Sequence, residues 1–123
     1  MRLVVPISLE TLTNTLDDLH ADYIDHRNWG APFHIIEVMN KEMNKGIALK
    51  RVADYYQIPK ERIIAFGDES NDLEMIDYAG IGVAMGNAID ELKSVANYVT
   101  DTNENNGVAN FLANYFNMNK LTV

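Results

Sequence analysis

The stretch "RIIAFGDESNDLEM", residues 62–75, joins an apolar strand to a cluster of acidic side chains. The run "IIAF" ends at Gly67, and the carboxylates of Asp68, Glu69 and Asp72 follow within five positions. Like charges at this spacing repel one another, so the arrangement costs free energy unless a cation lies among them. The stretch therefore predicts a buried strand, a tight turn and the start of a helix, which together hold a cation.

Composition fits one folded domain without a nucleic-acid or membrane partner. The chain has 123 residues, of which 47% are hydrophobic, and 10 Lys+Arg against 18 Asp+Glu give a net charge of -8. This charge repels phosphate backbones and anionic lipids. The absence of cysteine excludes disulfides and thiolate zinc sites. The apolar run at residues 3–7 is too short for a signal sequence, so a cytoplasmic location is expected.

The first 40 residues have the pattern of a small βαββ unit. "LVVPIS" reads as a strand, and Ser8 is a plausible N-cap for the helix that follows. "YIDHRNW" and "FHIIEVMN" read as two more strands, separated by turn-forming residues. The helix is indicated by leucines at spacings of three and four, namely Leu9, Leu12, Leu16 and Leu19.

After this unit, helices alternate with apolar strands. Helical patterns cover "NKGIALKRVADYYQIP", "NDLEMIDYAG", "AIDELKSVA" and "GVANFLANYF", and the strands between them are "RIIAF", "GIGVAM" and "NYVT". Such alternation is typical of βα units with a parallel sheet and helices on its faces. The predicted fold class is therefore α/β, with a boundary near residues 41–44.

In such sheets, ligands bind outside the carboxyl ends of the strands, where Asp68 follows its strand directly. Asp72 would lie in the first turn of the next helix, with Ser70 or Asn71 as the cap. Oxygen ligands without sulfur or a neighbouring histidine suit Mg²⁺ together with phosphate. The alternative is that both aspartates only form a polar turn and a helix cap.

Five motifs extend this interpretation: "NKGIAL", "GDESNDLEMI", "AGIGVAMGNA", "VT" and "NGVA". In this order, over about residues 43–116, they resemble the Cof-type branch of the haloacid dehalogenase (HAD) superfamily of phosphatases. The resemblance implies the second half of a Rossmannoid three-layer α/β/α core at residues 43–123. It further implies that residues 1–42 are the C-terminal part of an α+β cap domain. The implied activity is Mg²⁺-dependent hydrolysis of small phosphorylated metabolites.

The resemblance also implies roles for individual residues. Asp68 and Asp72 are the expected metal ligands, with Asp72 supporting either the metal or the lysine. Lys45 and Asp72 are the expected catalytic residues, because the lysine of the family neutralises the nucleophile and the phosphoryl oxygens. Lys45, Asn71 and Asn87 are expected to bind the substrate. An ammonium at a helix start opposes the helix dipole, which independently favours an anion close to Lys45.

One part of the family pattern has no counterpart in this sequence. HAD phosphatases carry a nucleophilic aspartate in a DxDGT-like motif, whereas the nearest candidate here, "LDDLH", lies within a predicted helix. We therefore expect the C-terminal portion of a longer phosphatase, inactive by itself. The alternatives are half of a split or self-complementing enzyme and a non-catalytic binding or structural remnant. An uncovered sheet edge would favour a homo-oligomer or a complementing N-terminal segment.

The first third of the chain holds further polar and aromatic side chains. His20, His26 and His34 share no spacing typical of metal ligands, and we interpret them as surface or core residues. Trp29 with Tyr23 is a candidate lining for a substrate pocket, although packing within the cap is the favoured interpretation. The sequence does not identify the substrate.

Overall fold

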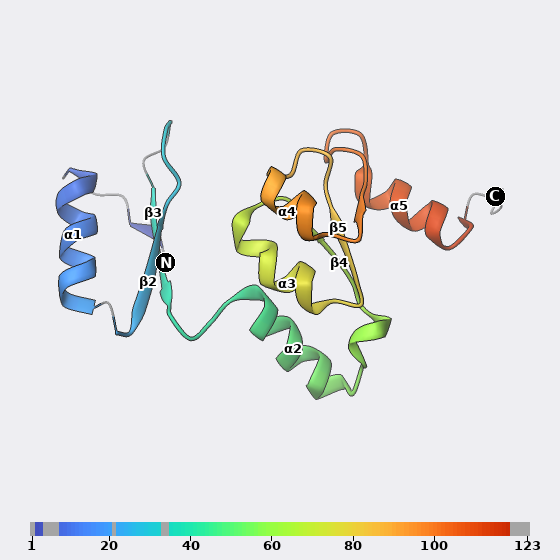
Figure 1. The fold of residues 1–123 in the computed structure, drawn as a ribbon, viewed down its shortest axis with the longest axis horizontal. Helices are drawn as coiled ribbons and strands as arrows, with labels where there is room; N and C mark the ends of the chain where they lie inside the picture. The colour runs from blue at the N-terminus through green and yellow to red at the C-terminus, as the bar shows by residue number, and fades with distance from the viewer. Residues whose placement is uncertain (1, 4–7, 21, 33–34, 119–123) are drawn as a thin grey trace. The chain divides into compact units, whose positions relative to one another are not determined.

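The computed structural model describes residues 2–3, 8–20, 22–32 and 35–118 and divides the chain into two compact units (Figure 1). Unit 1 comprises residues 1–43 and unit 2 comprises residues 44–123. None of the helices in these described ranges is long and apolar enough to cross a membrane.

Unit 1 is a three-stranded antiparallel sheet with one helix. Its elements are β1 (Arg2–Leu3), α1 (Leu9–His20), β2 (Ile24–Asn28) and β3 (Ile36–Asn40), and the strand order is β1-β3-β2. The Ser8 hydroxyl accepts the Thr11 N–H at 3.2 Å, as expected of the predicted N-cap. The predicted βαββ order is confirmed, while residues 4–7 and 33–34 of the predicted strands lie outside the described residues.

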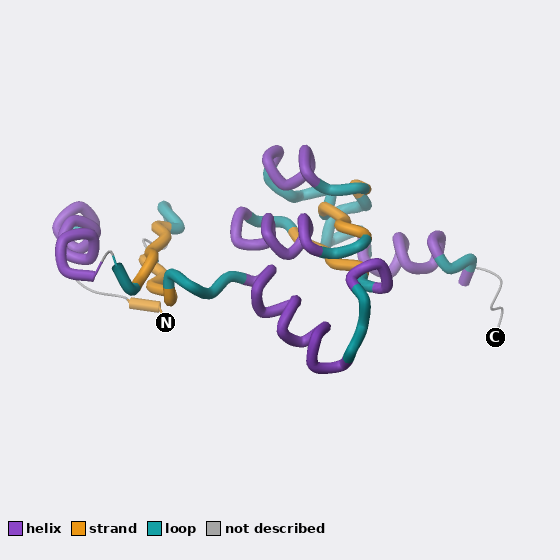
Figure 2. The backbone as a smooth tube through the Cα atoms, turned by 60° about the horizontal axis from the view of Figure 1, so that its bottom comes forward, coloured by secondary structure: helices purple, strands orange, loops and turns teal. Residues whose placement is uncertain are grey.

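Unit 2 is a parallel sheet with the strand order β4-β5-β6 and a helix in each connection (Figure 2). This arrangement confirms the predicted α/β class. The one-turn helices are η1 (Lys60–Arg62) and η2 (Ser70–Asp72). The other elements are α2 (Lys45–Tyr56), β4 (Ile64–Gly67), α3 (Leu73–Tyr78), β5 (Ile81–Ala84), α4 (Asp90–Val95), β6 (Tyr98–Val99) and α5 (Gly107–Tyr115).

The core of unit 2 lies between the sheet and the helices α3 and α4. Ala84 on β5, Ile76 on α3 and Leu92 on α4 belong to one cluster of buried side chains. On α5, the ring of Phe111 packs edge-on against Phe66 of β4, with 5.6 Å between ring centres. Burial of these side chains holds β4 in place, and with it the loop that follows its carboxyl end.

Helix α2 lies directly against α3 because of a glycine. A Cβ atom at Gly46 would lie 2.7 Å from the carbonyl oxygen of Glu74, which is closer than real Cβ contacts allow. The helix ends at Gln57, whose left-handed backbone (φ 56°) lets its N–H reach the carbonyl oxygens of Ala53 and Asp54. This close packing brings Lys45, at the start of α2, to the loop after β4.

One edge of the unit 2 sheet is open. Among the described residues β4 pairs with β5 alone, so its other edge has no strand partner. Apolar side chains of β6 and α5 are also exposed, including Tyr98, Tyr115 and Phe116. A cavity of about 490 Å³, lined in part by Val99, Phe111 and Tyr115, lies along the same two elements. The edge and this surface are suited to pairing with further polypeptide.

Candidate active site

The loop after β4 is built around the carboxylate of Asp72, which is only 3% exposed. Its Oδ2 atom accepts the backbone N–H groups of Asp68 at 2.9 Å and Glu69 at 3.1 Å. Gly67 makes room for this arrangement, because a Cβ atom there would lie 2.6 Å from the Cβ atom of Asp72. Asp72 therefore fixes the backbone that carries Asp68.

The other oxygen of Asp72, Oδ1, accepts a hydrogen bond from the ammonium group of Lys45. Lys45 is held at the start of α2, whose N-cap Asn44 accepts the Ile47 N–H at 2.8 Å. The Lys45 side chain is 49% exposed, although its ammonium group pairs with buried Asp72. Asp72 thus offsets the cost of a cation at a helix N-terminus and leaves Lys45 able to meet a second anion.

Asp72 stays ionised in this environment. Burial favours its neutral form, but the hydrogen bond from Lys45 and those from the backbone N–H groups of Asp68 and Glu69 outweigh burial. Together they hold the pKa of Asp72 below its ordinary value. Both carboxylate oxygens of Asp72 accept hydrogen bonds from groups of this chain.

Asp68 has a different environment, since its side chain is exposed at the carboxyl end of β4. The side-chain amide nitrogen of Asn87 lies 3.5 Å from Oδ2 of Asp68, and Oδ1 of Asn87 accepts the Asn103 N–H at 2.9 Å. The Ile89 N–H also donates to the Asp68 carbonyl oxygen at 3.0 Å. Asn87 therefore links the loops that follow β4, β5 and β6.

The structure brings the residues singled out from the sequence into one place. Lys45, Asp68, Asp72 and Asn87 are connected by the contacts above, and Asn71 lies in η2, within the same loop. The contacts of Asp72 match the second of its two expected tasks, support of the lysine. The hydrogen bond from the Asn103 N–H to Asn87 was not predicted, because it depends on a loop far along the sequence.

The predicted cap of the loop was wrong. The sequence favoured Ser70 or Asn71, but the N-cap of η2 is Glu69, whose carboxylate accepts the Ser70 N–H at 3.2 Å. Glu69 has the extended backbone (φ -122°, ψ 169°) that an N-cap requires, and the helical turn begins at the next residue.

The carboxylates of the loop determine which metal ion the site suits. Within the described ranges no group of three or more His, Cys, Asp or Glu side chains could hold a metal. Asp68 offers one exposed carboxylate, whereas both oxygens of buried Asp72 already accept hydrogen bonds, Oδ1 from Lys45 and Oδ2 from the loop. One carboxylate, completed by water and phosphate oxygens, is a donor set that suits Mg²⁺ and not Zn²⁺.

A family model described as haloacid dehalogenase-like hydrolase matches residues 5–112. The chain belongs to this family. It is 58% identical over 103 residues to the 5-amino-6-(5-phospho-D-ribitylamino)uracil phosphatase YitU of Bacillus subtilis, a match covering 84% of this chain and 38% of YitU. It is 47% identical over 79 residues to the phosphatase YwpJ of the same organism, covering 64% of this chain and 28% of YwpJ.

Solved structures of HAD hydrolases share the fold. A haloacid dehalogenase-like hydrolase from Bacteroides thetaiotaomicron matches with a TM-score of 0.77 and 32% identity, over 87% of this chain and 40% of that one. One from B. subtilis matches with a TM-score of 0.68 and 37% identity, over 94% of this chain and 38% of that one. The matched regions thus span 28–40% of the length of these HAD proteins.

The Lys45–Asp72 contact predicts a pH-dependent stability. Because the pKa of Asp72 is lowered on folding, its contribution is present above the ordinary value of 3.8 and is lost as the pH falls through the folded value. Lys45→Met should lower the free energy of unfolding at neutral pH by about 1 kcal/mol, a figure kept small because Lys45 is half exposed. Urea denaturation over a pH series measures the free energy of unfolding of both proteins. The difference between Lys45→Met and wild type should become smaller in acid.

Lys50→Met is the matched control. Lys50 pairs with Asp54 at 2.6 Å on the exposed side of the same helix, where an ion pair contributes little. A Lys45→Met effect that is independent of pH, or no larger than that of Lys50→Met, would contradict the assignment.

Proposed function

We propose that this chain forms part of a Mg²⁺-dependent phosphatase of small phosphorylated metabolites and contributes the positively charged side of its active site. The observation that carries the proposal is the half-exposed side chain of Lys45, whose ammonium group is fixed by buried Asp72 in the loop that presents exposed Asp68. A cation site next to a fixed ammonium group is the electrostatic arrangement that phosphoryl transfer uses.

Each residue has a role in this proposal. Asp68 would hold Mg²⁺, which when bound supplies positive charge to the phosphoryl oxygens. Lys45 pairs with the same oxygens from the start of α2, and Asn71 and Asn87 bind the substrate phosphate. Asp72 positions Lys45 and the backbone of the loop. In domain terms, residues 1–42 would belong to the cap and residues 43–123 to the core of a cytoplasmic enzyme.

The names of the relatives point to a first substrate for testing. Three B. subtilis relatives, 49–58% identical over the matched regions, are named 5-amino-6-(5-phospho-D-ribitylamino)uracil phosphatases. The printed sequence contains no DxDGT-like nucleophile motif, so the nucleophile must come from polypeptide outside it. The open edge of β4 favours, as the second candidate, an enzyme completed by a separate chain or by its own dimer.

The chain alone should not hydrolyse p-nitrophenyl phosphate faster than buffer with Mg²⁺, because no phosphoaspartyl intermediate can form without the nucleophile. Mixing it with the N-terminal portion of the B. subtilis relative YitU should produce phosphate release. Asp68→Ala and Lys45→Met should each reduce that release at least about 100-fold, whereas Lys50→Met should not.

Release by the isolated chain that Asp68→Ala abolishes would show that the chain is complete without the added segment. Release by the mixture that survives both Asp68→Ala and Lys45→Met would contradict the proposed roles.

Mg²⁺ should bind the isolated chain weakly, with a dissociation constant on the order of millimolar. The reason is that Asp68 is the one exposed carboxylate in the loop after β4, and Mg²⁺ gives up its water reluctantly. Calorimetry on wild type and Asp68→Asn measures this affinity. Micromolar binding that Asp68→Asn removes would mean that further residues of the chain complete the site.

The isolated chain should form dimers or higher oligomers at micromolar concentration. The unpaired edge of β4 and the exposed apolar side chains of β6 and α5 favour association. Light scattering should report a mass above the 13.9 kDa of one chain, and Tyr115→Ser with Phe116→Ser should shift it toward that value. A sharp monomer peak for wild type would rule the association out.

A further inference from the structure

The sheet of unit 1 has two different faces. His26 on β2 contacts Asp17 of α1 at 2.7 Å, so the His26 face of the strand is the one that α1 covers. Successive side chains of a strand point to opposite faces, which places Arg27 on the face away from α1. Glu37 is the antiparallel partner of Arg27 on β3 and shares that face.

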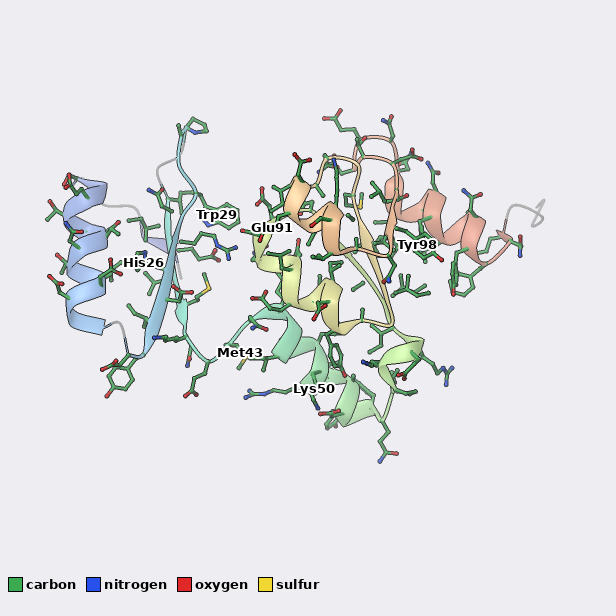
Figure 3. All side chains as sticks on the ribbon, viewed as in Figure 1. His26, Trp29, Met43, Lys50, Glu91 and Tyr98 are labelled. Carbon is green, nitrogen blue, oxygen red and sulfur yellow. The ribbon has the colours of Figure 1, made fainter. Side chains whose placement is uncertain are left out.

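Trp29 joins Arg27 and Glu37 into one cluster. Its indole N–H donates to Oε2 of Glu37 at 3.1 Å, and the guanidinium carbon of Arg27 lies 5.8 Å from the centre of its ring. Figure 3 shows Trp29 and His26 on opposite sides of the strands. A flat aromatic surface, a guanidinium donor and a carboxylate acceptor are therefore side by side on the face that α1 leaves uncovered.

The cluster lacks one acceptor. The Nη1 atom of Arg27 is buried and has no hydrogen-bond partner in the described part of the chain. Nor do the described residues include an ion pair between Arg27 and Glu37, although the two lie opposite each other in the sheet. Buried donors are almost always paired, so an unpaired guanidinium N–H calls for an acceptor from outside.

We infer that Arg27, Trp29 and Glu37 form a binding site for a planar heterocycle with an amide edge, such as a uracil ring. The ring packs against Trp29, a ring carbonyl accepts from Arg27, and a ring N–H donates to Glu37. The site consists of residues of unit 1 alone, and the choice of uracil as its ring rests on the proposed function, in which the relatives' names suggest the substrate.

Charged groups of both signs share this face, which suits a neutral ring that carries both a donor and an acceptor. Glu37 lies directly opposite Arg27, and Asp25 shares the same face two positions along β2. Arg2 of β1 is the other strand partner of Glu37, so the register places two arginines and two carboxylates on this face. A neutral ring with both a donor and an acceptor uses Arg27 and Glu37 at once. Side-chain rearrangement must accompany entry, since Nη1 is closed off from solvent.

Fluorescence tests the site directly, because Trp29 is the single tryptophan of the chain. The probe is 5-amino-6-(D-ribitylamino)uracil, the phosphate-free form of the compound in the relatives' names. We expect saturable quenching of Trp29, and an affinity about tenfold lower in Arg27→Lys, which keeps the charge but loses the planar fork. Arg51→Lys, the same change at an exposed position of α2, should bind like wild type.

Dimethyluracil, in which both ring N–H groups are methylated, should bind about tenfold more weakly than uracil because it cannot donate to Glu37. The inference is overturned if the probe gives no saturable quenching of folded wild type, or if Arg27→Lys binds it as tightly as wild type. It is also overturned if inorganic phosphate quenches Trp29 equally. None of these readings depends on phosphate release, so a failure here is distinct from a failure of the proposed phosphatase.

Discussion

The buried carboxylate of Asp72 is the interaction on which the site depends. Its three donors come from the loop after β4 and from Lys45, which is 27 positions away in the sequence. Moving either segment would leave a buried charge short of partners, which costs more than the net gain of an ordinary hydrogen bond. The start of α2 and the end of β4 are therefore fixed relative to each other, and Lys45 and Asp68 with them.

Glycines make this arrangement sterically possible. Gly67 leaves room for Asp72, and Gly46 lets the backbones of α2 and α3 touch. Gly86 does the same for the next loops, since a Cβ atom there would lie 2.9 Å from the backbone nitrogen of Thr102. Gly46, Gly67 and Gly86 are thus required sterically. Each is the chain neighbour of a residue of the site, namely Lys45, Asp68 or Asn87.

Sequence reasoning succeeded where the signal was local. The apolar runs of the parallel strands, the Ser8 cap of α1 and the position of Asp68 just past β4 follow from neighbouring residues alone. Sequence reasoning missed the contacts that depend on backbone dihedral angles, loop packing and strand register. Glu69 caps η2 because of its own dihedral angles, and the bond from Asn103 to Asn87 depends on loop packing. The pairing of Arg27 with Glu37 required the register of β2 on β3.

A phosphate clamp alone cannot choose among phosphate monoesters, because all of them present the same phosphoryl group to Lys45 and Asp68. Selectivity has to come from groups that recognise the remainder of the substrate. A site that hydrogen-bonds a substrate group discriminates strongly, since an analogue without that group leaves buried partners unpaired. Arg27 and Glu37 offer one donor and one acceptor beside a flat ring, whereas exposed apolar side chains such as Tyr23 would accept any apolar group. Recognition of an amide edge, as inferred for Arg27 and Glu37, is the kind of interaction that discriminates in this way.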